Sequence, residues 1–188
     1  MVLALSKDGT LYSWGSDPHG ALGTGGTEQL TPKAILTDVK SCDIRSSELL
    51  SWGWADTEDT VLTACSAIRK DGSLWVWGFN RGNLLGLGHG DPVTVPTKAA
   101  EHVKLHRAFA NDYLTEDGQL VDWAFVQERT ETPDEIDFSP RVIASGVHEY
   151  IPGPYGWRAV ILEDGTLLVR PVTDNPLERE PVRPFGDR

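Results

Sequence analysis

The sequence predicts an all-β protein built from a short antiparallel hairpin that is repeated four times. The dipeptide Asp-Gly recurs along the 188 residues, and each copy separates two short apolar segments. A turn-forming pair between two apolar segments is the strongest local signal for a β-hairpin. The raised content of glycine and proline, 19 and 12 residues, also suits many short strands joined by turns.

The four hairpins are expected over residues 2–15, 65–78, 111–124 and 158–171, around Asp8-Gly9, Asp71-Gly72, Asp117-Gly118 and Asp164-Gly165. Each turn is expected to be a two-residue type I′ turn, because Asp and Gly tolerate the positive φ that both of its central residues need. Counting outward from such a turn places Leu3 opposite Trp14 and Ser66 opposite Trp77. Small or apolar residues then line both faces of each hairpin. A half-solvated sheet would alternate more cleanly, so this pattern indicates a sheet pressed between two others.

The first two repeats share a longer sequence that carries a family resemblance. They read "ALSKDGTLYSWGSDPHGALGTG" and "AIRKDGSLWVWGFNRGNLLGLG", so a Trp-Gly pair in each is followed by a Gly-rich tail. These segments resemble the repeat of the regulator of chromosome condensation family. The third repeat keeps only Asp117-Gly118 and Trp123, and the fourth has Arg170 where the family has Trp. The resemblance covers almost the whole chain and implies a single domain, residues 1–188, of β-propeller blades.

Four repeats are fewer than the seven blades usual in the family, so we expect a partial or small propeller. Three arrangements are open: a closed four-bladed ring, half of a larger ring assembled from two chains, or one part of a longer protein. Of these, the assembled ring is favoured. Unpaired strand edges and apolar faces at the ends of an open array favour self-association, or a second chain that completes the propeller.

The composition narrows the classes of partner. The formal net charge is −11, and lysine and arginine are scattered, so direct binding of nucleic acid is not expected. No apolar run is long enough for a membrane span, and the expected location is the cytoplasm. Cys42 and Cys65 lack metal-site spacing, the five histidines form no ligand pattern, and no cofactor is expected. Single surface positions are the default interpretation for the histidines.

The functional prediction is a non-catalytic protein–protein interaction module, a scaffold that binds a partner of possibly basic character. The alternative, implied by the founding member of the family, is a guanine-nucleotide exchange factor for a small GTPase. A hydrolase or lyase that uses surface carboxylates, such as the acidic segment Glu128–Asp137, is the least favoured class. No catalytic triad order stands out in the sequence.

The binding surface is predicted on two loops that look enlarged relative to the family repeat, after Gly53 and after Gly146. Equivalent loops of equivalent blades share one face of a propeller, and binding residues concentrate in such loops. The candidate binding residues combine aromatic rings with acidic groups: Trp54, Asp56, Glu58, Asp59, His148, Glu149, Tyr150 and Tyr155. An alternative interpretation is that Trp54 and Tyr155 cap the core of their blades.

Overall fold

The computed structural model describes residues 1–48, 61–108, 110–123, 138–152 and 158–170. These residues form four antiparallel sheets, and the helical content of the described residues is a single 3₁₀ turn at Arg81–Asn83. The all-β prediction is therefore confirmed. Each sheet is one blade, and the blades are numbered here in chain order.

The first and last blades have three described strands, and the two central blades have four. Blade 1 comprises β1 (Val2–Leu5), β2 (Leu11–Ser16) and β3 (Glu28–Leu36). Blade 2 comprises β4 (Val39–Glu48), β5 (Val61–Arg69), β6 (Leu74–Gly78) and β7 (Val93–Ala100). Blade 3 comprises β8 (Val103–His106), β9 (Asp112–Thr115), β10 (Leu120–Asp122) and β11 (Arg141–Ala144). Blade 4 comprises β12 (Val147–Pro152), β13 (Arg158–Leu162) and β14 (Leu167–Arg170).

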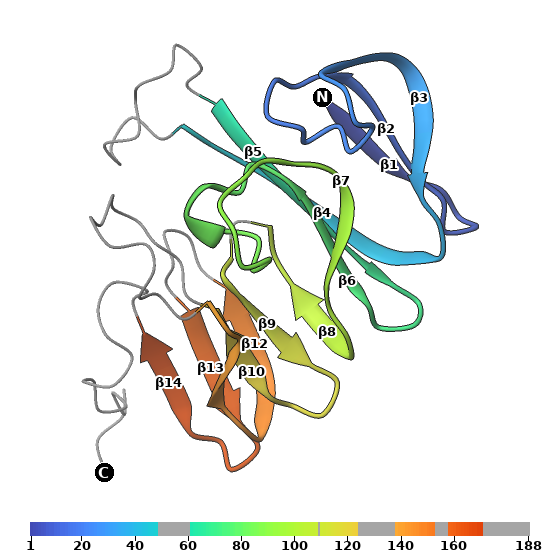
Figure 1. Ribbon diagram of the computed structural model, residues 1–188. Coiled ribbons are helices and arrows are strands. Elements are labelled where there is room, and N and C mark those ends of the chain that lie inside the picture. The colour runs from blue at the N-terminus through green and yellow to red at the C-terminus, as the bar shows by residue number, and fades with distance from the viewer. Residues whose placement is uncertain (49–60, 109, 124–137, 153–157, 171–188) are drawn as a thin grey trace, which may run out of the picture.

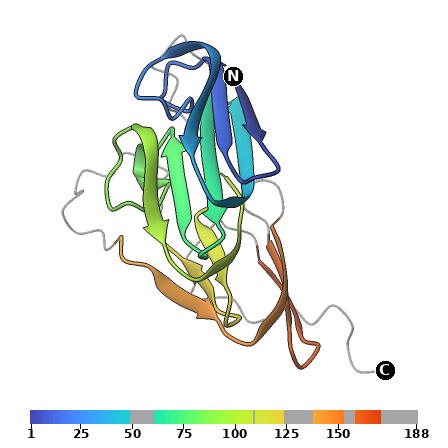
Figure 2. The ribbon, with the colours of Figure 1, turned by 90° about the vertical axis from the view of Figure 1, so that its right-hand side faces the viewer.

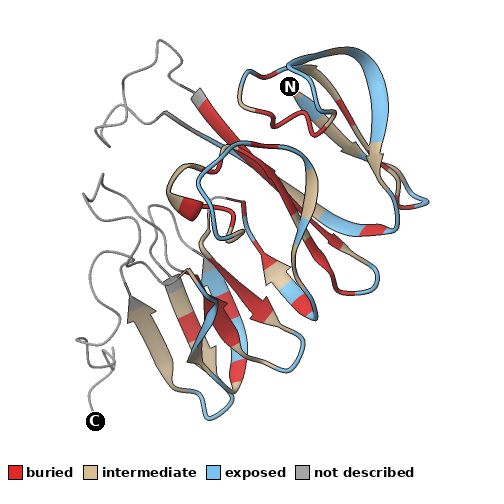
Figure 3. Cartoon of the chain, viewed as in Figure 1, coloured by how far each residue is buried: buried red, intermediate tan, exposed pale blue. Residues whose placement is uncertain are grey.

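The blades follow one another along an arc, with blade 1 and blade 4 at opposite ends (Figures 1 and 2). Neighbouring blades touch through their strands, as β1 does with β4 and β5 with β8. The main buried cluster runs through blades 1, 2 and 3, and a second cluster lies between blades 3 and 4 (Figure 3). The described blades thus form an open arc and not the closed four-bladed ring considered above.

The Asp-Gly turns contain three loop residues, so the prediction of two-residue turns is wrong. In blade 1 the Gly9 N–H donates to the Ser6 carbonyl over 3.0 Å, and the Ser6 N–H donates to the Thr10 carbonyl over 2.9 Å. Lys7, Asp8 and Gly9 therefore form a type I turn closed by a glycine bulge. The four turn glycines have positive φ as expected, but the four aspartates do not.

The additional loop residue shifts the predicted register by one. Val2, and not Leu3, pairs with Trp14, and Cys65, and not Ser66, pairs with Trp77. The aspartates close the turns through their side chains. The Oδ1 atom of Asp71 accepts the Ser73 N–H at 2.9 Å, and Asp8 and Asp164 do the same at their turns. Asp-Gly thus serves a side-chain-capped turn and not the positive φ of a type I′ turn.

Each turn also positions the next blade. The carbonyl of a turn glycine accepts a backbone N–H from the first residue of the following blade. The three pairs, at 2.8–2.9 Å, are Gly9 with Val39, Gly72 with Val103, and Gly118 with Val147. All three valines are buried. The repeat therefore specifies the stacking of the blades as well as the hairpins.

The Gly-rich tail of one blade packs against the tryptophan of the next blade and accepts a hydrogen bond from its indole N–H. The Trp77 indole N–H donates to the Ala21 carbonyl at 2.8 Å, and the Trp123 indole N–H donates to the Leu84 carbonyl at 3.2 Å. A Cβ atom at Gly86 would lie 2.5 Å from the Trp123 ring, so only glycine fits under that ring. Trp14 and Trp77 occupy matching register positions and Trp123 directly follows β10, which confirms their predicted equivalence.

Candidate binding surface

The two ends of the blades carry different kinds of connection between strands. One end carries the four Asp-Gly turns and the short links between blades, and the opposite end carries the remaining connections (Figure 1). We call this opposite end the loop rim; its described residues are 17–27, 79–92, 107–108, 110–111, 123 and 138–140. In chain order, the segments 49–60, 107–111 and 153–157 join the first strand to the second in blades 2, 3 and 4. These three segments are therefore equivalent by topology.

Five of the predicted binding residues, Trp54, Asp56, Glu58, Asp59 and Tyr155, lie outside the described residues. The other three lie in β12 and not in a loop, which corrects the expectation for His148, Glu149 and Tyr150. His148 and Glu149 are exposed. Tyr150 is buried, and its hydroxyl donates to the carboxylate of Asp112. Tyr150 therefore joins blade 4 to blade 3.

The assumed equivalence of Gly53 and Gly146 is also wrong. Gly146 has a φ of 66° and directly precedes β12, where Asp38 and His102, with φ values of 56° and 57°, precede β4 and β8. Gly146 thus marks the start of a blade. Gly53 follows β4 and lies outside the described residues. The two glycines therefore occupy different positions of the repeat, because Gly146 precedes the first strand of its blade and Gly53 follows it.

One aspartate on β4 holds two arginines, one on the same strand and one in the described part of the loop rim. Asp43, on β4, accepts the backbone N–H of Ala108 at 3.0 Å. The same carboxylate forms ion pairs with Arg45 at 3.3 Å and Arg107 at 3.7 Å, and both arginine side chains are about half exposed. Asp43 therefore joins blade 2 to the β8–β9 connection of blade 3 and orients two guanidinium groups toward solvent.

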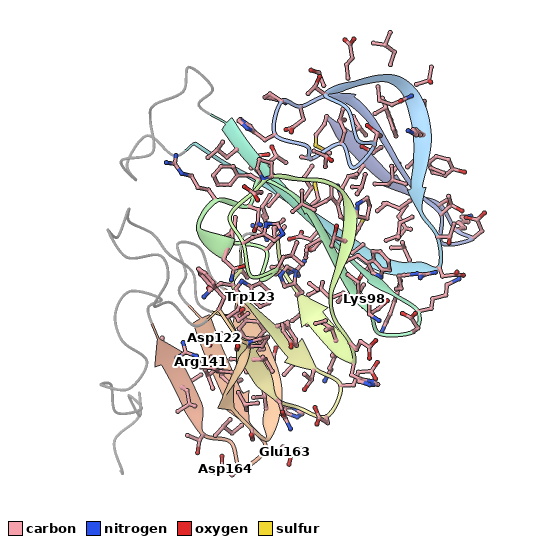
Figure 4. The ribbon with its side chains drawn as sticks, in the orientation of Figure 1. Lys98, Asp122, Trp123, Arg141, Glu163 and Asp164 are labelled. Atoms are coloured by element: carbon pink, nitrogen blue, oxygen red, sulfur yellow. The ribbon has the colours of Figure 1, made fainter. Side chains whose placement is uncertain are left out.

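Two carboxylates are buried opposite each other in blade 3. Asp112 and Asp122 are direct register partners on β9 and β10, and they are 3% and 5% exposed. Tyr150 donates to Asp112, and the Arg141 Nε lies 4.0 Å from Asp122. Figure 4 shows Asp122, Trp123 and Arg141 near the loop rim of this blade. The same pair of positions holds Leu3 and Ser13, Ser66 and Val76, or Ala159 and Val169 in the other blades.

The sequence did not single out the charged residues that make these contacts: Asp43, Arg107, Asp112, Asp122 and Arg141. A signal for the carboxylate pair was present, because aligned repeats show small or apolar residues where blade 3 has aspartates. Asp43 carried no such signal, since its partners come from another blade. Arg45 and Arg107 are far apart in the sequence, and the fold brings both to Asp43.

His106 is a further correction, because the default expectation for the histidines was a surface position. It is 5% exposed and lies 5.9 Å from the Trp123 ring in a stacked arrangement. Its Nε2 lies 3.3 Å from the Ala110 carbonyl. Burial lowers the pKa of His106 from 6.5 to about 4, which keeps the ring neutral near pH 7.

In the part of the chain that the structure describes, no three or more His, Cys, Asp or Glu side chains are grouped so that they could hold a metal ion. The same residues contain no helix that is both long enough and apolar enough to cross a membrane. Burial raises the pKa of the thiols of Cys42 and Cys65, and the Cys65 Sγ contacts the Ala21 carbonyl at 3.6 Å. The described residues of the loop rim that are discussed above form ion pairs and hydrogen bonds.

The consecutive four-stranded and three-stranded blades define a protein built of β-propeller blades. Residues 71–106 match the model of the regulator of chromosome condensation (RCC1) repeat. The segment from the Asp-Gly turn of blade 2 to β8 thus carries an RCC1-type repeat, as the sequence resemblance indicated.

Relatives carry the same repeat. RCC1 domain-containing protein 1 of Mus musculus is 27% identical over 117 residues, which cover 62% of this chain and 26% of that protein. The E3 ubiquitin-protein ligase HERC2 of Homo sapiens is 25% identical over 135 residues, which cover 68% of this chain and 3% of that protein. The chain therefore spans only a minor part of the length of these relatives.

Solved structures show the same fold. Human WBSCR16 superposes with a TM-score of 0.56 at 18% identity, over 89% of this chain and 44% of that one. Prp20p of Saccharomyces cerevisiae, whose structure was described with its binding properties to Gsp1p and histones, gives a TM-score of 0.56 at 20% identity, over 89% and 41%. The arc thus matches less than half of each of these chains.

Proposed function

We propose that this chain is a non-catalytic protein-interaction module that binds a protein partner through the loop rim. The observation that carries the proposal is that Asp43 anchors both Arg45, its neighbour on β4, and Arg107, in the β8–β9 connection. An arginine whose guanidinium is already held by an ion pair loses little conformational freedom on binding. Arginine and aromatic side chains are also the commonest anchors of protein interfaces.

The partner we propose is basic. The formal net charge of −11 attracts a basic protein at long range. In the segment 49–60, Asp56, Glu58 and Asp59 add acidic groups between β4 and β5. Such charges raise the rate of encounter and set the orientation of the partner more than they raise the final affinity.

The proposal is tested with purified core histones as the basic probe, because Prp20p is described with histone-binding properties. Replacing Asp56, Glu58 and Asp59 by their amides is expected to lower the association rate with the immobilised full chain about tenfold at low salt. The matched control removes three exposed charges from the Asp-Gly end, Glu101→Gln, Glu116→Gln and Glu163→Gln, and leaves the rate unchanged. Equal losses in both variants, or no histone binding at all, would contradict the proposal.

A guanine-nucleotide exchange activity is the alternative, and the likeness in fold to Prp20p is what favours it. The measurement is the release of labelled GDP from Gsp1p in the presence of the full chain. Accelerated release that is lost in Arg107→Ala would make exchange the function of the loop rim. Release at the intrinsic rate, together with histone binding, would leave the interaction module as the function.

A further inference from the structure

The first strand of blades 2, 3 and 4 carries a β-bulge at the same position. In β4 the cross-strand register shifts between Val39 and Ser41, so Lys40 has no register partner on β5. The registers of β8 and β12 shift in the same way, at Lys104 and His148. A bulge of this kind turns one side chain out of the regular pleat of the strand. Three successive blades therefore re-aim a side chain at the same place.

All three bulge residues are basic, and all three are exposed: Lys40, Lys104 and His148. The valine before each of them is buried, and its N–H donates to the turn glycine of the preceding blade. The backbone at each bulge is therefore fixed. Blades 2 and 3 have a blade on each side, so the exposure of the two lysines does not come from an end of the arc.

The bulge residues differ from the other basic side chains at the Asp-Gly end. Arg69 pairs with Asp38 there, and Lys98 pairs with Glu101. Among the described residues, the side chains of the three bulge residues have no hydrogen-bond or ion-pair partner. The formal net charge of the chain is −11, so a row of basic groups without an acidic partner is a local exception.

The expected spacing of the row matches one kind of extended peptide. Packed sheets lie about 10 Å apart, so equivalent bulge residues of neighbouring blades are separated by about that distance. A polyproline II helix has three residues per turn, which places every third side chain on one side at intervals of about 9 Å. The flexible four-carbon stem of lysine takes up the remaining difference.

We propose that Lys40, Lys104 and His148 bind an acidic segment of a partner polypeptide, in the polyproline II conformation with Asp or Glu at every third residue. Its carboxylates accept hydrogen bonds from the two ammonium groups and from the imidazole N–H. The net charge of −11 opposes a nucleic acid, which has a charge on every nucleotide, more strongly than this peptide. The row lies beside the Asp-Gly turns and not on the loop rim, so this proposal does not rest on the proposed function.

The probe is a capped peptide of three Glu-Pro-Pro repeats, titrated into the isotope-labelled full chain at low salt and followed by NMR. The backbone amide signals of Lys40, Lys104 and His148 are expected to shift. A control peptide of the same composition has its three glutamates adjacent, between two runs of three prolines. It reaches fewer of the basic groups at once and is expected to bind about fivefold more weakly.

Two double variants of the chain locate the binding. Lys40→Gln with Lys104→Gln removes both ammonium groups of the row and is expected to weaken binding of the regularly spaced peptide about tenfold. The matched control, Lys7→Gln with Lys98→Gln, removes the same charge from exposed lysines at the same end of the blades. It is expected to leave the affinity within about twofold of that of the unchanged chain, because distant surface charges are screened.

Three outcomes would overturn the proposal. Absence of binding by the regularly spaced peptide is the first. Equal affinity of the two peptides, or equal losses in the two double variants, is the second, because binding would then follow net charge alone. The third is tighter binding of a single-stranded deoxythymidine oligonucleotide that is lost in the variant with Lys40→Gln and Lys104→Gln. That result would assign the row to a nucleic acid.

Discussion

At the scale of single residues, the burial of His106 makes the stability of the fold depend on pH. The unfolded chain takes up a proton near the ordinary pKa of 6.5, whereas the folded chain resists protonation down to about pH 4. Between these values the unfolded state binds more protons, so stability falls as the pH falls. The largest cause is the loss of solvation of the imidazolium between Trp123 and the backbone.

We therefore expect the free energy of unfolding to fall by up to roughly 3 kcal/mol from this group as the pH is lowered from 7 to 4. His106→Gln is expected to flatten the decline, since the amide can still donate to the Ala110 carbonyl. Urea unfolding at a series of pH values measures the slope. The exposed His148 provides the control: His148→Gln leaves the decline in place. A decline that is the same in His106→Gln and in the unchanged protein would show that other groups cause it.

At the scale of strands and turns, local chemistry predicted which segments form hairpins but not their exact pairing. Asp-Gly suits both a two-residue turn and a three-residue turn with a glycine bulge, and the choice moves every cross-strand pair by one. The hydrogen bond from Gly9 to Ser6 decides it, and nothing in the dipeptide shows that bond in advance. The sequence shows the Gly-rich tails as a shared feature of the first two repeats, but their packing against the next tryptophan is a contact between blades, which one repeat alone does not show.

This role predicts a clear difference between two neighbouring glycines of one tail. Gly86 and Gly88 have φ values of 71° and 81°, so valine at either position incurs similar backbone strain, about 1–3 kcal/mol. At Gly86 the new side chain would also enter the Trp123 ring, which adds about 1–3 kcal/mol of overpacking.

Thermal and urea unfolding of Gly86→Val and Gly88→Val measure this difference. The first variant is expected to be the less stable of the two and to show altered Trp123 fluorescence. Equal destabilisation of the two variants would mean that the packing of Trp123 does not require glycine at position 86.

At the scale of the whole molecule, the sequence predicted the class of the fold and the equivalence of the tryptophans. It predicted the binding residues less well. The candidate loops were placed after two glycines, whereas blades begin directly after Asp38, His102 and Gly146, which share positive φ but not residue type. Asp43 and Asp112 acquire their partners Arg107 and Tyr150 only when separate blades meet, so a linear pattern could not show these contacts.

In an array of blades, a blade that has a neighbouring blade on both sides should be more stable than a blade at the end of the array. Blades 2 and 3 have a blade on each side, and blade 1 has one neighbour among the described residues. Backbone amides of β5 and β6 are therefore expected to exchange with solvent more slowly than those of β1, which opens with the end of the array. Hydrogen–deuterium exchange with mass spectrometry gives this order directly, because peptides from residues 2–5 and 61–78 are distinguishable. Uniform protection along the arc would mean that the blades unfold as one cooperative unit. Stronger protection of β1 than of β5 would mean that the face of blade 1 directed away from blade 2 is already covered in solution.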